Sequence, residues 1–357
     1  MTAPAVGSAV RERRAVPDAA GVMVLGACAV WSLLSAYGRE ARPEGVLLAV
    51  LAVAAGYACG RICGSLLPVA AAAAVALAAL GLALAFPEGI PGTTATPALG
   101  HTGADAALAA LAAGAACCAA SAAGRPALRL SLRLLALGIA GTAAVLGSAA
   151  GCAAALGVLL CSLAASRMRY RLVGLAGLAL AAGLTAGLSW AVAEDALPDG
   201  LSVSLEGQLT RNRVQLWEDA VELAKDHPVL GAGPDRFGVL SPTAAQQSPE
   251  SDGTPHSAAL QQAAEQGIVG VALLGASFGW VLYGLWRSPR STPVVLTAGA
   301  ALTALAVLAS VGNALSFTPV TAGAGLLAGL ATARPLREEV LETVPGGFGS
   351  DARIPHF

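Results

Sequence analysis

Apolar residues run along this chain in long stretches, separated by short polar turns and by one long polar interval. The stretches fall at about residues 19–37, 45–63, 66–86, 104–122, 132–148, 150–165, 172–193, 264–286, 292–312 and 319–333. A helix needs about 20 mostly apolar residues to cross the hydrocarbon core of a bilayer. The pattern therefore predicts an all-α, polytopic membrane protein with about ten transmembrane helices and one long extracytoplasmic loop.

The composition is that of a membrane protein rather than of a soluble domain. Hydrophobic residues make up 56% of the chain and charged residues only 12%, whereas a soluble domain carries about 25% charged residues. The net charge of −1 gives no basic surface, so we expect no nucleic-acid partner and a lipid bilayer instead. The abundant alanine and glycine let helices approach one another closely in lipid.

The arginines predict the orientation of the chain. With the N-terminus in the cytoplasm, the outside short loops contain only Arg39 and Arg42. The inside segments then carry Arg11, Arg13, Arg14, Arg61, Arg125, Arg129, Arg133, Arg167, Arg169, Arg171, Arg287, Arg290, Arg334, Arg337 and Arg353. Cytoplasmic loops are enriched in Lys and Arg, so we expect both termini on the cytoplasmic side of the membrane.

This orientation predicts five parts. They are a cytoplasmic tail 1–18, a bundle of about seven spans at 19–193, an extracytoplasmic loop with short helices at 194–257, about three spans at 258–333, and a cytoplasmic tail 334–357. The spans contain almost no ionisable residues, which argues against a proton- or ion-coupled transporter.

The seven cysteines all lie in apolar segments. Cys59 and Cys63 share one helix face and could hint at a metal. Buried small apolar residues are the commoner explanation.

The long loop contains one amphipathic helix. Apolar residues repeat at helical spacing within residues 212–226, at Val214, Trp217, Val221 and Ala224. We expect this stripe to lie on the membrane surface or on the spans, with Trp217 as an interface anchor. Residues 201–209 before it are a short strand or an interfacial segment. Gly231 and Gly233 after it indicate a tight turn.

A second helix is predicted to begin at Thr254-Pro255, with Thr254 as N-cap and Pro255 at the first helical position. It would run through Glu265 into the next span. Its N-terminus carries partial positive charge, which favours a phosphate oxygen there and disfavours protonation of His256. A neutral imidazole can serve as a general base near neutral pH.

Two motifs in this loop resemble the superfamily of O-antigen ligases and polymerases of the bacterial envelope. The first is Arg213-x-x-x-Trp217, then His227-Pro228-Val229-Leu230-Gly231-Ala232-Gly233 and Phe237. The second is His256-Ser257, nine residues, then Gly267-Ile268-Val269-Gly270, with Glu265 at a frequently acidic position. The resemblance covers about residues 205–275 closely. Ser257 departs from the commonest Asn, and Val271-Ala272 follow Gly270 where some ligases have a Thr pair.

The resemblance implies transfer of a glycan from a polyprenyl-diphosphate donor to a hydroxyl of a glycan, glycolipid or glycoprotein on the outer face. It implies no cofactor, neither a nucleotide sugar nor an obligatory metal. His256 would be the base, and Arg213, Arg211 and Arg236 would bind the diphosphate, because guanidinium matches phosphate oxygens. Glu265 would bind sugar or cap a neighbouring element.

Two other functions stay open at this point. A carrier or flippase of lipid-linked sugars would need polar residues along a path through the spans. The departures from the motifs are also compatible with a non-catalytic member of the family. Ligase and polymerase cannot be separated from each other, because both use the same leaving group and the same type of nucleophile.

Overall fold

The computed structural model describes residues 4–85, 101–194, 211–246 and 253–334, with the side chains of residues 4–15, 101–102 and 211 left out of the description. The expected segment at 201–209 and both ends of the chain lie outside these residues. The described part is helical throughout and contains no strand.

Each of the ten apolar stretches forms a helix. The helices are α1 Pro4–Ala36, α2 Glu44–Leu66, α3 Pro68–Ala85, α4 His101–Ala122, α5 Pro126–Val145, α6 Ala149–Ala165, α7 Arg171–Ala193, α12 Ala258–Trp286, α13 Thr292–Ser310 and α14 Thr318–Thr332. Eight of them are long and apolar enough to cross a membrane. The other two, α6 and α14, have 17 and 15 residues. The all-α polytopic membrane architecture is confirmed.

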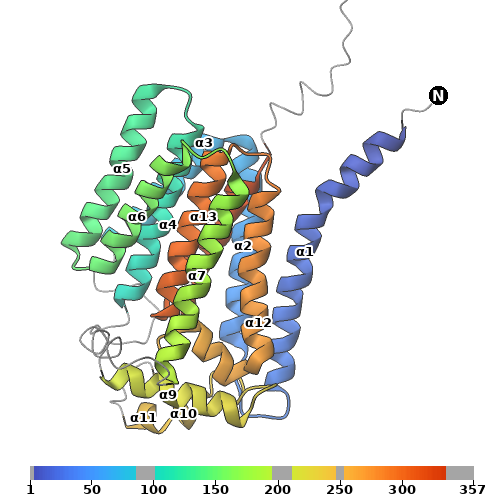
Figure 1. Cartoon of the computed structure of the whole chain (residues 1–357), viewed down its shortest axis with the longest axis vertical. Helices are drawn as coiled ribbons and strands as arrows, with labels where there is room; N and C mark the ends of the chain where they lie inside the picture. Colours follow the sequence, from blue (N-terminus) through green and yellow to red (C-terminus); the bar gives the residue numbers. More distant parts are fainter. Residues whose placement is uncertain (1–3, 86–100, 195–210, 247–252, 335–357) are drawn as a thin grey trace, which may run out of the picture.

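The helices stand side by side in one bundle, with α9 Arg211–Asp226 lying across one end (Figure 1). The most enclosed span is α4, of which 89% of the most apolar 18 residues is buried, followed by α13 with 67%. Alanine dominates α4, so neighbouring helices can pack close to its backbone on every side. Other helices, such as α2 and α7, are more exposed.

The turns group at the two ends of the bundle in the way that the arginines predicted. At one end, the Arg171 side chain donates to Ser288 O and the Arg290 side chain to Gly64 O. At the other end, Arg42 N donates to Pro234 O. We call the end that holds α9 the loop end and the opposite end the arginine-rich end. The cytoplasmic placement of the arginine-rich end stays a prediction.

Glycines bring α2 and α14 into backbone contact. A Cβ atom at Gly56 or Gly60 would overlap a main-chain carbonyl of α14, and one at Gly325 or Gly329 would overlap a main-chain carbonyl of α2. In lipid, where the hydrophobic effect between helices is absent, such close van der Waals packing drives helix association. This contact fixes the last helix of the chain against the second.

We expect Gly60→Ala to destabilise the protein, because the new methyl group would meet the carbonyl oxygen of Leu326, a backbone atom that cannot rotate away. The cost should be about 1–3 kcal/mol, typical of overpacking in a core. The measurement is the unfolding temperature in detergent. Gly141→Ala on α5 is the matched control, since its Cβ would meet no atom within 4 Å. An equal effect of the two changes would contradict the role of the α2–α14 contact.

Candidate functional site

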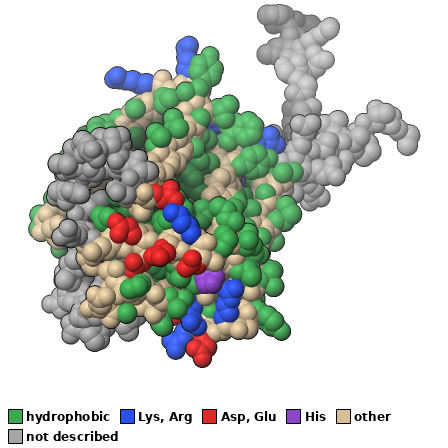
Figure 2. Space-filling view, turned by 60° about the horizontal axis from the view of Figure 1, so that its bottom comes forward, with side chains coloured by type: hydrophobic (Ala, Val, Ile, Leu, Met, Phe, Trp, Pro, Cys, Tyr) green, Lys and Arg blue, Asp and Glu red, His purple; other side chains and the backbone are tan. Residues whose placement is uncertain are grey.

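Polar residues gather at the loop end. Here α9, the one-turn helices α10 Phe237–Leu240 and α11 Pro242–Ala245, and the first turns of α12 form a layer across the bundle (Figure 1). Figure 2 shows acidic, basic and histidine side chains together on this end. A second core, separate from that of the spans, holds the layer together: Leu216, Trp217, Ala220 and Val221 of α9 pack with Ala193, Phe237, Ala244, Leu260 and Ala264.

Trp217 is at the centre of this second core. The side chain is 1% exposed, and its Nε1 donates to Pro255 O at 2.6 Å. The prediction of a membrane-interface anchor is therefore wrong. The α9 stripe as a whole packs on the ends of α7 and α12, so the expectation that it lies on the spans is confirmed. Phe237 of α10 and Ala244 of α11 belong to the apolar pocket of the indole, and Pro255 O, just before α12, accepts its N–H group.

The segment from Pro228 to Gly233 is bound to a break in α12. The helix leaves helical geometry at Gly267, where φ is 68° and ψ is −165°. Three main-chain hydrogen bonds cross between the two segments: Ala232 N to Ala264 O (2.8 Å), Gly233 N to Glu265 O (2.9 Å) and Ile268 N to Pro228 O (2.9 Å). The main-chain N–H groups of Ala232 and Gly233 thus bond carbonyls of α12 that, in a continuous helix, would accept hydrogen bonds from the helix itself.

Gly231 and Gly267 make this approach possible. Both have positive φ, and a Cβ at either would overlap the backbone of the opposite segment. The predicted turn at Gly231 and Gly233 is confirmed, since both have positive φ. The two sequence motifs are therefore one structural unit, joined main chain to main chain.

His256 lies just before α12 in a left-handed conformation, with φ of 50°. The prediction that Thr254 caps the helix and Pro255 begins it is wrong, because α12 begins at Ala258. The Pro255 carbonyl accepts from Trp217 instead of from a helical N–H group, and the chain bends at His256 before the helix begins. His256 is half-buried between Pro255 and Ser257, which are both fully buried. The backbone of His256 is thereby fixed on both sides.

Arg213 lies in the first turn of α9, one turn before Trp217 on the same helix face. Its Nη1 donates to Val311 O, at the C-terminal end of α13, at 3.2 Å. Trp217 connects the two predicted site residues in the chain of contacts: Arg213 lies one turn before it on α9, and its indole is bonded to the residue that precedes His256.

Of the other two predicted phosphate ligands, Arg236 contacts a different part of the structure, and the side chain of Arg211 is not described. Arg236 reaches the loop between α1 and α2, where its Nη1 donates to Glu40 O at 3.1 Å and lies 3.9 Å from the Glu40 carboxylate. Its Nε is buried without a hydrogen-bond partner. The side chain of Arg211 lies outside the described residues.

Glu265 is 5% exposed, in the last turn before the break of α12. Gln261 Nε2 lies 3.4 Å from its carboxylate, and the main-chain amides of Asp235 and Phe237 donate to that carboxylate. This is the contact expected of a residue that caps a neighbouring element. A role of Glu265 in sugar binding stays a prediction.

The last turns of α1 and the loop after it are a part of the site that the sequence analysis missed. The Arg39 side chain donates to Gly231 O, and Trp31 Nε1 donates to Gln266 O at 3.0 Å. A signal was present, since Arg39 and Arg42 are the two exceptions to the arginine asymmetry of the short loops. The Arg39 side chain is bonded to the Pro228–Gly233 segment, and Arg42 is joined to Pro234 O through its main-chain N–H group.

No three His, Cys, Asp or Glu residues of the described ranges lie together in a way that could hold a metal ion. Cys59 and Cys63 are exposed on the outer side of α2 rather than buried as expected.

Comparison with known proteins gives a family match that covers this part of the chain. A family model described as O-antigen ligase matches residues 93–275, just over half of the chain. The match takes in α9, His256 and the α12 break. No curated protein matches the chain. Membership in this family implies glycan transfer in the assembly of envelope polysaccharide, on lipid-linked glycan substrates. On the extent of the match, this multi-pass membrane protein belongs to the O-antigen ligase family.

Proposed function

We propose that the protein transfers a glycan from a polyprenyl diphosphate to a hydroxyl acceptor at the loop end, on the outer face of the membrane. The observation that carries the proposal is the conformation of His256. A histidine with φ of 50° between two buried neighbours is strained backbone, and such strain concentrates at functional sites. The arginine distribution and the family membership support the outer face and the lipid-linked donor.

The proposed reaction has one proton transfer and one bond exchange. His256 accepts the proton of the acceptor hydroxyl as its oxygen bonds to the anomeric carbon of the donor sugar. The bond between that carbon and the diphosphate oxygen breaks, and the polyprenyl diphosphate leaves with the electron pair. Negative charge therefore grows on the diphosphate, where guanidinium groups stabilise it best.

Arg213 is the first candidate for this stabilisation, since it lies one turn before Trp217, whose indole is bonded to the residue that precedes His256. Arg211 precedes it by two residues and is the second candidate. Arg236 faces the α1–α2 loop, so we assign it to the outer part of a diphosphate path rather than to the reacting bond. Glu265 is buried, so it would act on a sugar only indirectly, by holding the main chain of Asp235 and Phe237 in place at the wall of the site.

Arg213→Lys should lower kcat/KM about 10- to 100-fold, because lysine keeps the charge but loses the planar fork, and a hydrogen bond to a charged group is worth about 1.5–3 kcal/mol. The measurement is initial rate in a transfer assay at several donor concentrations. Lys225→Gln, at an exposed position on the same helix, is the control and should leave the rate unchanged. Full activity of the Arg213→Lys variant would remove Arg213 from the mechanism.

The function itself is tested with the wild-type protein in detergent, given a polyprenyl-diphosphate glycan and a separate glycan or lipid acceptor. Disappearance of the donor together with free polyprenyl diphosphate and an enlarged acceptor would establish transfer. Growth of the donor-linked chain without any other acceptor would identify a polymerase. Movement of intact donor across proteoliposomes without transfer would instead favour the carrier, and neither activity would favour the non-catalytic member.

A further inference from the structure

A cavity of about 440 Å³ opens at the arginine-rich end, opposite the candidate site. Its walls come from the start of the apolar part of α1, the C-terminal half of α2, the end of α12 with the turn after it, and the end of α14. Its size falls within the range of small-molecule sites, about 300–1,000 Å³. The proposed transfer reaction makes no use of it.

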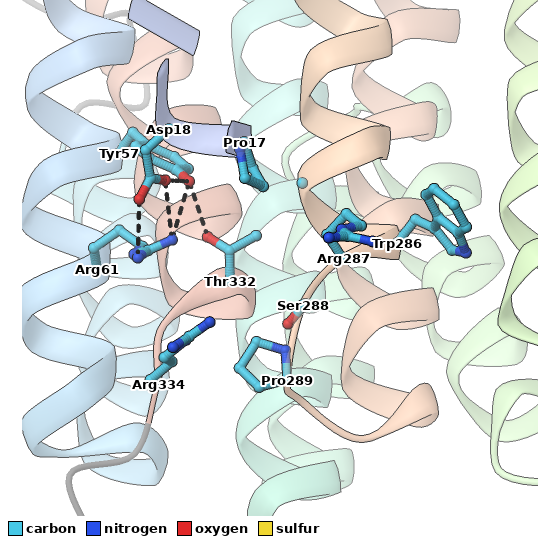
Figure 3. Close-up of a pocket in the computed structure, with 11 residues that line it drawn as sticks. Pro17, Asp18, Tyr57, Arg61, Trp286, Arg287, Ser288, Pro289, Thr332 and Arg334 are labelled. Atoms are coloured by element: carbon cyan, nitrogen blue, oxygen red, sulfur yellow. Dashed lines mark hydrogen bonds and ion pairs between the residues drawn. The ribbon is translucent and has the colours of Figure 1, made fainter. Parts of the chain in front are cut away.

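One wall of the cavity is a fixed polar network (Figure 3). Asp18 of α1 receives two hydrogen bonds from Arg61 of α2, at 3.2 and 3.3 Å, and one from Tyr57 at 3.0 Å. Thr332 of α14 donates to the Tyr57 hydroxyl at 3.4 Å. Since these bonds tie three helices together, the cavity is a built feature of the fold.

Positive charge predominates in the lining. Three arginines, Arg61, Arg287 and Arg334, line the cavity together with a single acidic residue, Asp18. Figure 3 shows Arg61 and Arg334 on one side and Arg287 on the other, with Thr332 between them. Asp18 pairs with Arg61, so the charge of the lining as a whole is positive and favours an anion.

The cavity is lined by residue types that are common where a span ends at the membrane–water interface. Arg287 is the residue after the last turn of α12, and its guanidinium carbon lies 6.0 Å from the ring centre of Trp286, which is 42% exposed. Exposed tryptophan next to arginine at the end of a span is typical of the membrane–water interface. Pro17, Gly284 and Pro289 supply apolar lining beside the charges.

We propose that this cavity binds the phosphodiester headgroup of an anionic phospholipid. A guanidinium pair matches phosphate oxygens, and basic pockets between transmembrane helices on the cytoplasmic side hold acidic lipid headgroups. The lipid would lie against α1, α2 and α14 and so brace the first and last spans. This inference is independent of the proposed transfer reaction.

The test uses the delipidated protein in detergent and counts bound lipid by native mass spectrometry. The probes are phosphatidylglycerol, phosphatidylcholine and millimolar inorganic phosphate. We expect the wild type to retain one phosphatidylglycerol in preference to phosphatidylcholine. The double variant Arg287→Gln/Arg334→Gln should bind it roughly 10- to 30-fold more weakly, since each arginine near an anionic lipid contributes about 1 kcal/mol.

The charge-matched control is Arg125→Gln/Arg169→Gln, which removes two arginines at the same end but outside the cavity, and it should bind as the wild type does. If the double variant does not fold, Arg334→Gln alone should show a smaller loss. Equal binding of both lipids by all variants would overturn the proposal. So would a thermal shift produced by inorganic phosphate alone, because the ligand would then be a soluble anion.

Discussion

His256→Ala should reduce glycan transfer by about 10²- to 10⁴-fold, the contribution usual for a positioned general base. The loss should appear in kcat more than in KM, because the imidazole acts on the acceptor proton in the transition state and contributes little to donor binding. The fold should survive, since the side chain is half-buried and belongs to neither hydrophobic core. The measurement is single-turnover release of polyprenyl diphosphate by the purified variant.

Two further variants make this result interpretable. Alanine tolerates the left-handed conformation of residue 256 poorly, whereas asparagine adopts it readily, so His256→Asn removes the base with less backbone strain. The two His256 variants should therefore be equally inactive. His227→Ala is the matched control, since His227 is exposed at the same end and directly follows α9, and it should keep full activity. Transfer at the wild-type rate by His256→Asn would exclude His256 as the base.

Sequence periodicity predicted the helices well because it is a local property. The helix expected at 212–226 is Arg211–Asp226 in the structure, and each of the ten apolar stretches is a helix. The turn at Gly231 and Gly233 was equally predictable, since glycine is the residue that most easily adopts positive φ.

The start of α12 was predicted wrongly because a contact distant in sequence decides it. Thr254-Pro255 has the residue types of a helix N-terminus, but Trp217, 38 residues earlier, takes the Pro255 carbonyl. Trp217 itself was misplaced for a related reason. Tryptophan at the edge of a span is common, and no local pattern reveals that short helices would enclose the ring in a core of their own.

The hydrophobic pattern alone did not predict the break in α12. Polar residues such as Gln262 and Gln266 precede Gly267 and apolar residues follow it, but both are compatible with one continuous helix, as is a single glycine. What breaks the helix is pairing with the Pro228–Gly233 segment, which replaces helical hydrogen bonds with bonds to another part of the chain. The resemblance marked Gly267 as a motif residue, and the structure supplies the physical reason for a glycine there.

Gly267→Ala should disorder the loop end and abolish glycan transfer. With φ of 68° and ψ of −165°, Gly267 occupies a region that is essentially restricted to glycine, at a cost of about 1–3 kcal/mol for other residues. The added methyl group would also overlap the carbonyl oxygen of Val229, so the Pro228–Gly233 segment would have to move away. That movement would break its three bonds to α12 and disturb α9, which ends at Asp226 just before this segment and carries Trp217.

The effect of Gly267→Ala is measured by limited proteolysis of the loop end and by the transfer rate of the same preparation. Cleavage between α9 and α12 should become faster while the spans stay intact, and the transfer rate should fall at least about 100-fold, as expected when a reacting group is misplaced by about 1 Å. Gly275→Ala is the matched control on the same helix, because its Cβ would meet no atom within 4 Å. A Gly267→Ala variant as resistant and as active as this control would mean that the break in α12 does not organise the site.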